Sequence, residues 1–429
     1  MNILMMTNTF TPHVGGVARS VEAFMVEYQR LGHGVLVVAP VFEGMPEKEL
    51  NVIRVPAIQN FNGSDFSVRL PIPSFLFPAL DRFRPDIVHT HHPFLLGDTA
   101  LRVAALRNVP LVFTHHTLYE QYTHYVPGDS PALKRFVVEL STGYANLCDQ
   151  VIAPSESIAL ILQGRGVKVP IEVIPTGVNV EQFARGDGAK FRALMGIPQD
   201  AFVVGHVGRL APEKNLRFLA EAVVDFLKAN DRTHFLIAGV GPSAGEIMGL
   251  FEREDLANRL HLTGILQAGD LANAYHAMDV FAFASQSETQ GMVLTEAMAA
   301  GVPVVAVDAP GVREVVTDTR NGRLLPIEDL KGFSSALSWL ASLSPKERRG
   351  LSEAARETAD GFSLPRCTAR ALDLYKSLLT SGPVPRNIEG SLWSSALRMI
   401  ETEWDLWVNR AHAASAALTR SRPHDKVTP

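Results

Sequence analysis

Cysteine is scarce: the chain of 429 residues holds only Cys148 and Cys367. Two cysteines are too few for a disulfide framework or a cysteine zinc site, and this usage is typical of a reducing cytosol. Positive charge is not in excess either, because 40 Lys and Arg stand against 45 Asp and Glu, a formal net charge of -5. Binding to the phosphate backbone of nucleic acid needs a basic excess. We therefore expect a cytoplasmic protein that does not bind nucleic acid.

Long hydrophobic runs are missing as well. No stretch approaches the roughly 20 uncharged apolar residues that span a bilayer. The segment from Met1 to Thr7 is apolar for a short distance, lacks a basic region and leads into Asn8, so it predicts a strand rather than a signal peptide. Any contact with a membrane is therefore expected to be peripheral, on its inner face.

The chain does have the apolar content and the length of a folded protein. Hydrophobic residues make up 46% and charged residues 20% of it, and the mean hydropathy is +0.08, whereas disordered chains are poorer in apolar groups. At about 100–200 residues per domain, the length indicates two or three domains, each with its own core.

Short runs rich in Val, Ile and Phe alternate with helical patterns, as expected of parallel sheets covered by crossover helices. The first series of predicted strands is Ile3–Thr7, Val35–Ala39, Val52–Val55, Asp86–Thr90, Leu111–His115, Val151–Pro154 and Glu172–Pro175. The second series is Val203–Val207, His234–Gly239, Leu260–Gly264, Val280–Ala284, Pro303–Val307 and Gly322–Pro326. This alternation predicts an α/β fold with two doubly wound, Rossmann-like domains in tandem.

A polar segment between the two series sets the predicted domain boundaries. Residues 179–201 lack a sustained period, and we expect them to link an N-terminal domain (1–178) to a C-terminal domain (202–362). Doubly wound sheets bind ligands beyond the carboxyl ends of their strands. Two such domains facing across a cleft are therefore expected to place the chemistry there.

The loop after the first predicted strand carries Gly15 and Gly16, directly before a predicted helix. Two glycines at a helix start let a phosphate approach the backbone N–H groups and the positive end of the helix dipole. A plain tight turn is the alternative, because a Gly-Gly pair by itself is not specific.

The first strand of the second domain leads into Gly208-Arg209, and Lys214 follows five residues after the arginine. An arginine and a lysine at the carboxyl end of a strand can together neutralise a diphosphate, the arginine as a planar fork and the lysine as a point charge. A solvated basic loop is the alternative.

A third motif combines two carboxylates. Glu288 lies after a predicted strand, and Glu296 is expected two turns into the following helix. Between them, the backbone N–H groups of Gly291, Met292 and Val293 would point at the same anion site.

Together these motifs resemble the retaining family-4 glycosyltransferases of GT-B fold, and the resemblance extends from residue 1 to about residue 380. It implies a nucleotide-diphosphate sugar as the donor, with a UDP-sugar favoured and a GDP-sugar as the alternative. No metal or other cofactor is then required, because arginine and lysine supply the charge that Mg²⁺ would otherwise give.

The resemblance also implies roles for the matching residues. Glu296 would accept hydrogen bonds from both ribose hydroxyls, and Glu288 would contact hydroxyls of the donor sugar. The remaining donor contacts would come from Gly15, Gly16, Arg209 and Lys214 at the diphosphate and from the backbone around Gly264 and Ile265 at the base.

Histidines gather at the ends of two consecutive predicted strands: His89, His91 and His92 on one, His115 and His116 on the next, with His124 further on. A hydrolase that uses a divalent metal ion is one interpretation, but such a site adds clustered carboxylates, and this region offers only Asp98. Rings packed at a domain edge are the other interpretation, and we expect no metal site. The segment Thr114–Thr117 resembles the family segment whose histidine contacts the donor sugar and leaving phosphate, which implies a catalytic role for His116.

The segments 86–97 and 114–127 more closely resemble one branch of the family, which contains bacterial diacylglycerol glucosyltransferases and related lipid glycosyltransferases. Tyr119, Tyr122 and Tyr125 recur every three residues and would share one face of a helix. With His124 they are the candidate acceptor side, and an aromatic core stripe is the alternative.

Two further segments are candidates for membrane contact. Phe61–Pro85 interleaves apolar residues with Arg, which suits an interfacial helix and equally a helix packed on its sheet. A helix at about 364–380 is expected to cross back onto the N-terminal domain, as the resemblance implies. The tryptophan-containing extension 381–429 would then pack on the body, on a second copy in a homo-oligomer, or on a membrane.

We therefore predict a metal-independent retaining glycosyltransferase that moves a hexose, with glucose favoured, to a hydroxyl acceptor such as diacylglycerol at the cytoplasmic face of a membrane. A soluble or polysaccharide acceptor is the first alternative. A nucleotide-sugar epimerase or hydrolase on the same fold is the second, since fold alone does not decide function. An inactive sugar-nucleotide-binding scaffold is the third, although such a scaffold has no need of both carboxylates and both cations.

Overall fold

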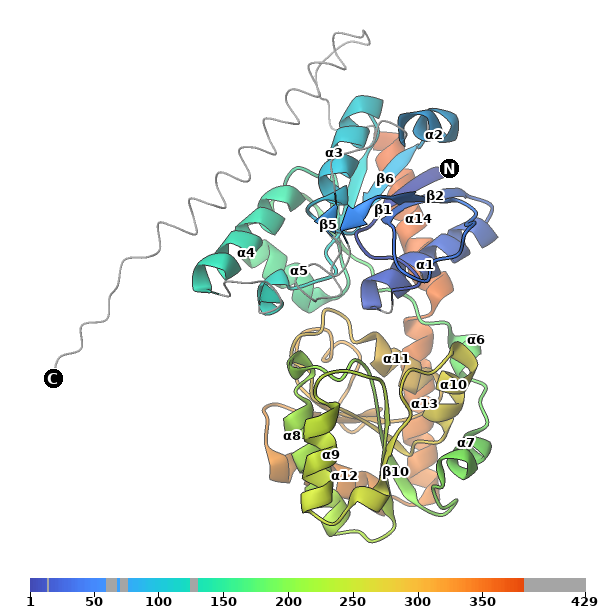
Figure 1. Ribbon diagram of the computed structural model, residues 1–429, viewed down its shortest axis with the longest axis vertical. Coiled ribbons are helices and arrows are strands. Elements are labelled where there is room, and N and C mark those ends of the chain that lie inside the picture. Colours follow the sequence, from blue (N-terminus) through green and yellow to red (C-terminus); the bar gives the residue numbers. More distant parts are fainter. Residues whose placement is uncertain (14, 59–67, 70–75, 124–129, 382–429) are drawn as a thin grey trace, which may run out of the picture. The chain divides into compact units, whose positions relative to one another are not determined.

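The computed structural model describes residues 1–13, 15–58, 68–69, 76–123 and 130–381 (Figure 1). It divides into two compact units, each with its own sheet. We call Met1–Pro175 with the chain from Cys367 the N-terminal unit, and Thr176–Arg366 the C-terminal unit. The predicted extension 381–429, apart from Ser381, lies outside the described residues.

The N-terminal unit is built on a parallel sheet of seven strands in the order β3-β2-β1-β6-β7-β8-β9. The strands are β1 (Asn2–Met6), β2 (Gly34–Pro40), β3 (Val52–Val55), β6 (Ile87–Thr90), β7 (Leu111–Thr114), β8 (Gln150–Ala153) and β9 (Ile171–Val173). β4 (Ala57–Ile58) and β5 (Val68–Arg69) form a small antiparallel pair that the sequence did not predict, because two residues are too few to show a period.

Helices cover both faces of this sheet. They are α1 (Gly16–Arg30), α2 (Leu76–Phe83), α3 (Leu96–Arg107), α4 (Pro131–Ala145), α5 (Glu156–Gly164) and α14 (Leu364–Ser381). Alternate residues of β1 face opposite cores: Leu4 packs with α2 to α5, and Ile3 packs with α1 and α14 (Figure 1). In α14, Cys367, Ala371 and Tyr375 recur every four residues and are buried in the second core, so the helix belongs to this unit from Cys367 onward.

The C-terminal unit has a parallel sheet of six strands in the order β12-β11-β10-β13-β14-β15. The strands are β10 (Phe202–Val207), β11 (Thr233–Ala238), β12 (Leu260–Leu262), β13 (Val280–Phe283), β14 (Val304–Val307) and β15 (Gly322–Leu325). Its helices are α6 (Val180–Phe183), α7 (Gly188–Met195), α8 (Leu216–Lys228), α9 (Ala244–Arg253), α10 (Ala268–His276), α11 (Met292–Ala299), α12 (Leu330–Ser342) and α13 (Pro345–Gly361). The predicted α/β class with two Rossmann-like sheets is confirmed, and every predicted strand is present to within two residues at either end.

The segment predicted as a linker is structured. Residues 179–201 hold α6 and α7, whose Phe183 and Phe191 are buried in the core of the C-terminal unit. The boundary between the units therefore falls between Pro175 and Thr176. The two helices have 4 and 8 residues, which is too short for a helical period to stand out from a polar background.

Candidate active site

The glycine pair of the N-terminal unit lies where β1 leads into α1. Gly15 is the N-cap, with an extended backbone, and Gly16 is the first residue of the helix. A Cβ added at Gly16 would meet no described atom within 4 Å, whereas one at Gly15 would lie 3.1 Å from the His13 ring. The side of Gly16 is therefore open, which leaves room for a ligand beside the first turn of α1.

In the C-terminal unit, an ion pair joins the loops that follow β10 and β13. Lys214 ends the short helix η4 (Pro212–Lys214), and Glu288 lies beyond β13. Lys214 Nζ is 2.5 Å from Glu288 Oε1, and the two side chains are 19% and 17% exposed. The hydroxyl of Ser287 donates to the backbone carbonyl of Glu213 at 3.2 Å, which ties the same two loops together. Because β10 and β13 are neighbours, their loops leave the same edge of the sheet.

Glu288 carries its negative charge inside this pair. Burial by itself raises the pKa of the Glu288 carboxyl, but the charge and hydrogen bond of Lys214 outweigh it, with help from the Ser285 hydroxyl, so that the pKa lies below its ordinary value. The site therefore presents a carboxylate and an ammonium that neutralise each other.

Glu296, the second carboxylate, is held by a different partner. It lies in the second turn of α11, which begins at Met292. Its side chain is 2% exposed, and the Tyr275 hydroxyl donates to Oε2 at 2.8 Å. The Tyr275 hydroxyl therefore orients the Glu296 carboxylate.

The other donor-site residues predicted in this unit lie in loops at the carboxyl ends of its strands. Arg209 is exposed and follows β10 by two residues. Gly264 follows β12 with φ 73°, in the left-handed region that favours glycine, and its neighbour Ile265 is 59% exposed. Gly291 is the left-handed N-cap of α11, and Met292 and Val293 are the first two residues of that helix.

The histidines of the N-terminal unit have separate partners. His89 Nδ1 is 2.6 Å from the Tyr375 hydroxyl, which accepts a hydrogen bond from Tyr28, and His89 Nε2 is 2.7 Å from Thr114 Oγ1. His92 Nδ1 accepts from the backbone N–H of Asn8 at 3.1 Å. These two rings therefore hold α14 and the loop after β1 in place.

His91 contacts the predicted catalytic histidine directly. His91 Nδ1 is 2.9 Å from His116 Nε2, although 25 residues separate them in the chain. Burial lowers the pKa of His116 to about 3 and that of His91 well below its ordinary value. Both rings are therefore neutral near pH 7.

The predicted tyrosine face is only partly described. The segment forms a short helix, η2 (Tyr119–Gln121), rather than a longer one, and the Tyr119 ring packs edge-on against Phe94 and His115 with centroids 5.2 and 5.8 Å away. Tyr119 thus packs as the core alternative expects. Tyr122 is half-buried, while His124 and Tyr125 lie outside the described residues.

Sequence reasoning missed several residues that shape these sites. Tyr275 holds Glu296, and Tyr375 reaches His89 across 286 residues. His206, in β10, is 1% exposed and donates from Nδ1 to the Ala282 carbonyl at 3.1 Å. A polar residue in the apolar run Phe202–Val207 was the one signal that could have drawn attention to His206.

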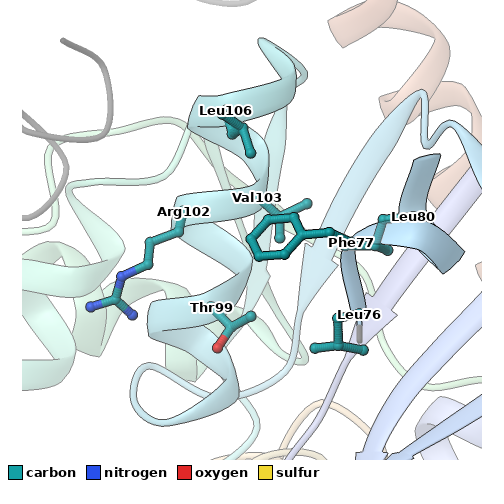
Figure 2. Close-up of a pocket in the computed structure, with 7 residues that line it drawn as sticks. All are labelled: Leu76, Phe77, Leu80, Thr99, Arg102, Val103 and Leu106. Atoms are coloured by element: carbon teal, nitrogen blue, oxygen red, sulfur yellow. The ribbon is translucent and has the colours of Figure 1, made fainter. Parts of the chain in front are cut away.

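A small apolar pocket lies between α2 and α3 (Figure 2). It is lined by Leu76, Phe77 and Leu80 of α2 and by Thr99, Arg102, Val103 and Leu106 of α3. Leu76 and Leu80 are buried against the sheet, so this part of Phe61–Pro85 packs on its sheet, whereas Phe77 is 37% exposed. Residues 61–67 and 70–75 lie outside the described residues.

Two features are absent from the described residues. No helix in the described part of the chain is both long and apolar enough to cross a membrane. Nor do the described residues group three or more His, Cys, Asp or Glu side chains as metal ligands.

Comparison with known proteins matches both halves of the chain to glycosyltransferases. Residues 14–182 match Glycosyltransferase Family 4, and residues 189–358 match Glycosyl transferases group 1. The chain is 30% identical over 330 residues to alpha-monoglucosyldiacylglycerol synthase of Streptococcus pneumoniae, covering 76% of this chain and 75% of that protein. It is 29% identical over 385 residues to a GDP-mannose-dependent alpha-mannosyltransferase of Mycobacterium tuberculosis, covering 88% and 97%.

Solved structures agree on the fold. The HepE protein of Anabaena in complex with UDP superimposes with a TM-score of 0.71 at 20% identity, covering 88% of this chain and 100% of that one. The chain therefore belongs to the family-4 glycosyltransferases of GT-B fold.

Proposed function

We propose that this glycosyltransferase is a retaining enzyme that moves a hexose, with glucose favoured, from a nucleotide-diphosphate sugar to a membrane lipid such as diacylglycerol. The observation that carries the donor half is the Lys214–Glu288 pair at the carboxyl edge of the C-terminal sheet. The acceptor half is supported by the 30% identity to a protein named as a monoglucosyldiacylglycerol synthase.

The donor would bind along the loops of the C-terminal unit. Glu296 would accept from both ribose hydroxyls, a task that suits a carboxylate already oriented by Tyr275. The exposed side chain of Ile265, beside Gly264, would pack on the base. Arg209 and Lys214 would hold the diphosphate, with the backbone N–H groups of Gly291 to Val293 and the open side of Gly16, next to Gly15, as further contacts.

The same residues would lower the barrier to transfer. The bond from the sugar to the leaving phosphate breaks, and the acceptor hydroxyl attacks on the face from which the phosphate departs. The phosphate takes the acceptor proton, while Arg209 and Lys214 stabilise the charge that grows on it. Two side-chain cations at the diphosphate would make a divalent metal unnecessary, and Glu288, released from Lys214, would hold the sugar hydroxyls.

We propose a UDP-sugar as the donor, and a GDP-sugar is the alternative. The solved structure of HepE contains UDP, whereas the Mycobacterium tuberculosis relative is named for GDP-mannose. Thermal-shift measurements distinguish the two donors, because a ligand at 100 times its dissociation constant adds about 2.7 kcal/mol to the unfolding free energy. UDP-glucose should raise the melting temperature more than GDP-mannose at equal concentration.

We propose that the enzyme binds its lipid acceptor at the inner face of a membrane. Phe77 is exposed beside the apolar pocket of α2 and α3 (Figure 2), and Arg102 lines the same pocket. An apolar side chain at the surface favours insertion rather than charge attraction, so salt should weaken binding to vesicles only slightly. Phe77→Ser should release the chain from diacylglycerol vesicles. Leu194→Ser, at a 78% exposed leucine of α7, is the matched control and should sediment like the parent.

One assay tests the whole proposal. The full chain is incubated with UDP-glucose and vesicles that contain diacylglycerol, with and without EDTA, and the anomeric configuration of the product is read by NMR. We expect an α-glucosyl lipid in both conditions. Complete loss with EDTA, restored by Mg²⁺ or Mn²⁺, would contradict the metal-free mechanism. Free sugar formed without acceptor would indicate a hydrolase. Transfer to soluble sugars alone would contradict the proposed lipid acceptor. Nucleotide binding without turnover would indicate a scaffold.

A further inference from the structure

The histidines at the ends of β6 and β7 are not explained by donor binding alone. His116 is the one with a proposed catalytic role, and the ring that touches it through a hydrogen bond is His91. His91 is 1% exposed, and its own ring packs on His89 with centroids 4.2 Å apart. The ring is thus clamped between His89 and His116, with its Nδ1 aimed at His116 Nε2.

The contact between two neutral imidazoles admits only two proton arrangements. One nitrogen must donate and the other must accept across the 2.9 Å between His91 Nδ1 and His116 Nε2. If His116 donates, the proton of His91 must sit on its Nε2. If His91 donates, its Nε2 is a bare lone pair, and the proton of His116 must sit on Nδ1.

The surroundings of His91 distinguish these arrangements. Its Nε2 is buried and has no hydrogen-bond partner among the described residues. A buried N–H without an acceptor loses its hydrogen bond to water and gains nothing in return, and such orphaned donors are rare in folded proteins. The arrangement with a protonated His91 Nε2 is therefore disfavoured, and His91 donates from Nδ1.

We propose that His91 is a positioning residue, which donates from Nδ1 to His116 Nε2 and thereby holds His116 as the neutral tautomer with its proton on Nδ1. In this tautomer the proton of His116 lies on Nδ1, on the side of the ring away from His91. This suits an oxygen of the donor sugar or of the leaving phosphate, and it assigns His116 to donating a hydrogen bond rather than to accepting the proton of the acceptor hydroxyl. The inference rests on the proposed function in its use of His116.

The chain offers a graded set of variants at this position. His91→Asn places an amide N–H near the Nδ1–H of histidine and keeps the donor. His91→Asp places a carboxylate oxygen there, which can only accept and so draws the His116 proton onto Nε2. His91→Leu removes the hydrogen bond altogether, and a thermal melt of each variant shows that it is folded.

The first measurement reads the tautomer without any substrate. Two-bond ¹H–¹⁵N spectra of the full chain, labelled with ¹⁵N histidine, distinguish a protonated from a bare ring nitrogen. The His116 signals are assigned by their loss in His116→Gln. We expect a protonated Nδ1 and a bare Nε2 on His116 in the parent and in His91→Asn, and the reverse in His91→Asp. A protonated His116 Nε2 in the parent would overturn the proposal.

The second measurement reads turnover. Loss of one oriented hydrogen bond predicts that kcat falls about tenfold in His91→Leu and more in His91→Asp, with KM for the nucleotide sugar unchanged, while His91→Asn keeps a kcat near that of the parent. An equal fall of kcat in the Asn and Leu variants would show that His91 acts only through packing, and it would overturn the proposal. If His116→Gln turns over like the parent, the proposed catalytic role of His116 fails, whereas the tautomer result stands by itself.

Discussion

At the scale of single residues, the two carboxylates of the C-terminal unit differ in what holds them. Glu296 is anchored by the Tyr275 hydroxyl, and Glu288 by the ammonium of Lys214. This difference in partners is the reason that we propose a binding role for Glu296 and a role in turnover for Glu288.

Glu296→Ala should weaken the binding of the nucleoside diphosphate about 10-fold to 100-fold, because hydrogen bonds to a charged acceptor contribute about 1.5–3 kcal/mol. Glu288→Ala should lower kcat far more than it weakens nucleotide binding. Calorimetry with the diphosphate and steady-state kinetics measure the two effects. Parental affinity in Glu296→Ala would show that the ribose is held elsewhere.

Gly16 gives a second prediction at this scale. A Cβ at Gly16 meets no described atom within 4 Å, so Gly16→Ala should leave the unfolding free energy unchanged or raise it by about 0.5–1 kcal/mol. If a phosphate approaches this face, the same change should reduce kcat/KM for the nucleotide sugar about tenfold. Gly350→Ala, in α13 and equally unobstructed, is the matched control and should change only stability. Identical kinetics in both variants would remove Gly16 from the donor site.

At the scale of elements, the strand order explains why the pair Lys214 and Glu288 forms. The residues lie 74 positions apart, but β10 and β13 are adjacent, and parallel neighbours release their loops at the same edge. The hydroxyl of Ser287 closes the same two loops on each other through Glu213. The pair therefore stabilises the arrangement of these two loops.

Lys214→Met should reverse the way in which Glu288 makes the unfolding free energy depend on pH. In the parent, the pKa of Glu288 is lowered, so its contribution is present above the ordinary value of 4.5 and is lost as the pH falls through the lowered pKa. Without Lys214, burial is the largest influence on the pKa of Glu288, and the Ser285 hydroxyl and His206 oppose it only in part. The pKa should therefore rise, and the variant should lose stability as the pH rises. Allowing for partial exposure, we expect a loss of about 2–3 kcal/mol at pH 8 and a smaller one at pH 4.

Urea unfolding at the two pH values measures this loss. Arg232→Met is the control, because the pair of Arg232 with Asp200 is 83% and 67% exposed and should contribute little at either pH. An equal loss in Lys214→Met at pH 4 and pH 8 would show that Glu288 does not depend on Lys214 for its charge.

At the scale of the whole molecule, the buried histidines make folding sensitive to acid. Burial lowers the pKa of His89, His92, His115 and His116 to about 3. An unfolded chain binds protons at these rings below the ordinary value of 6.5, while the folded chain does not. Their neutral form is therefore compatible with folding above pH 6.5, and stability is lost as the pH falls from 6.5 towards 3.

We expect the unfolding free energy to fall between pH 7 and pH 5, by about 2 kcal/mol for each histidine that stays neutral. His115 offers a clean test, because neither of its ring nitrogens has a hydrogen-bond partner among the described residues. His115→Leu should reduce the slope of the unfolding free energy against pH between pH 4 and 6. The reduction should correspond to one proton, about 1.4 kcal/mol per pH unit. Chemical unfolding across this range measures the slope, and an unchanged slope would mean that His115 titrates alike in both states.

The sequence alone was sufficient to predict the strands of both sheets and the segments after those strands that contain Gly16, Arg209, Lys214, Glu288 and Glu296. These features depend on local properties: runs of β-branched residues, the glycines that punctuate them, and the rule that parallel strands place their loops at one edge. The helices α6 and α7 escaped prediction because they are short and mostly polar, and their place is decided by the core against which Phe183 and Phe191 pack.

Only the tertiary structure decided which side chains meet. His91 and His116 lie 25 residues apart, Tyr275 and Glu296 21 apart, and Tyr375 and His89 286 apart. No periodic pattern links such positions, because each contact depends on the rotamers and packing of elements that are brought together only in the folded chain. The same holds for protonation, since burial by distant segments, rather than neighbouring residues in the sequence, keeps His116 neutral and leaves its tautomer to His91.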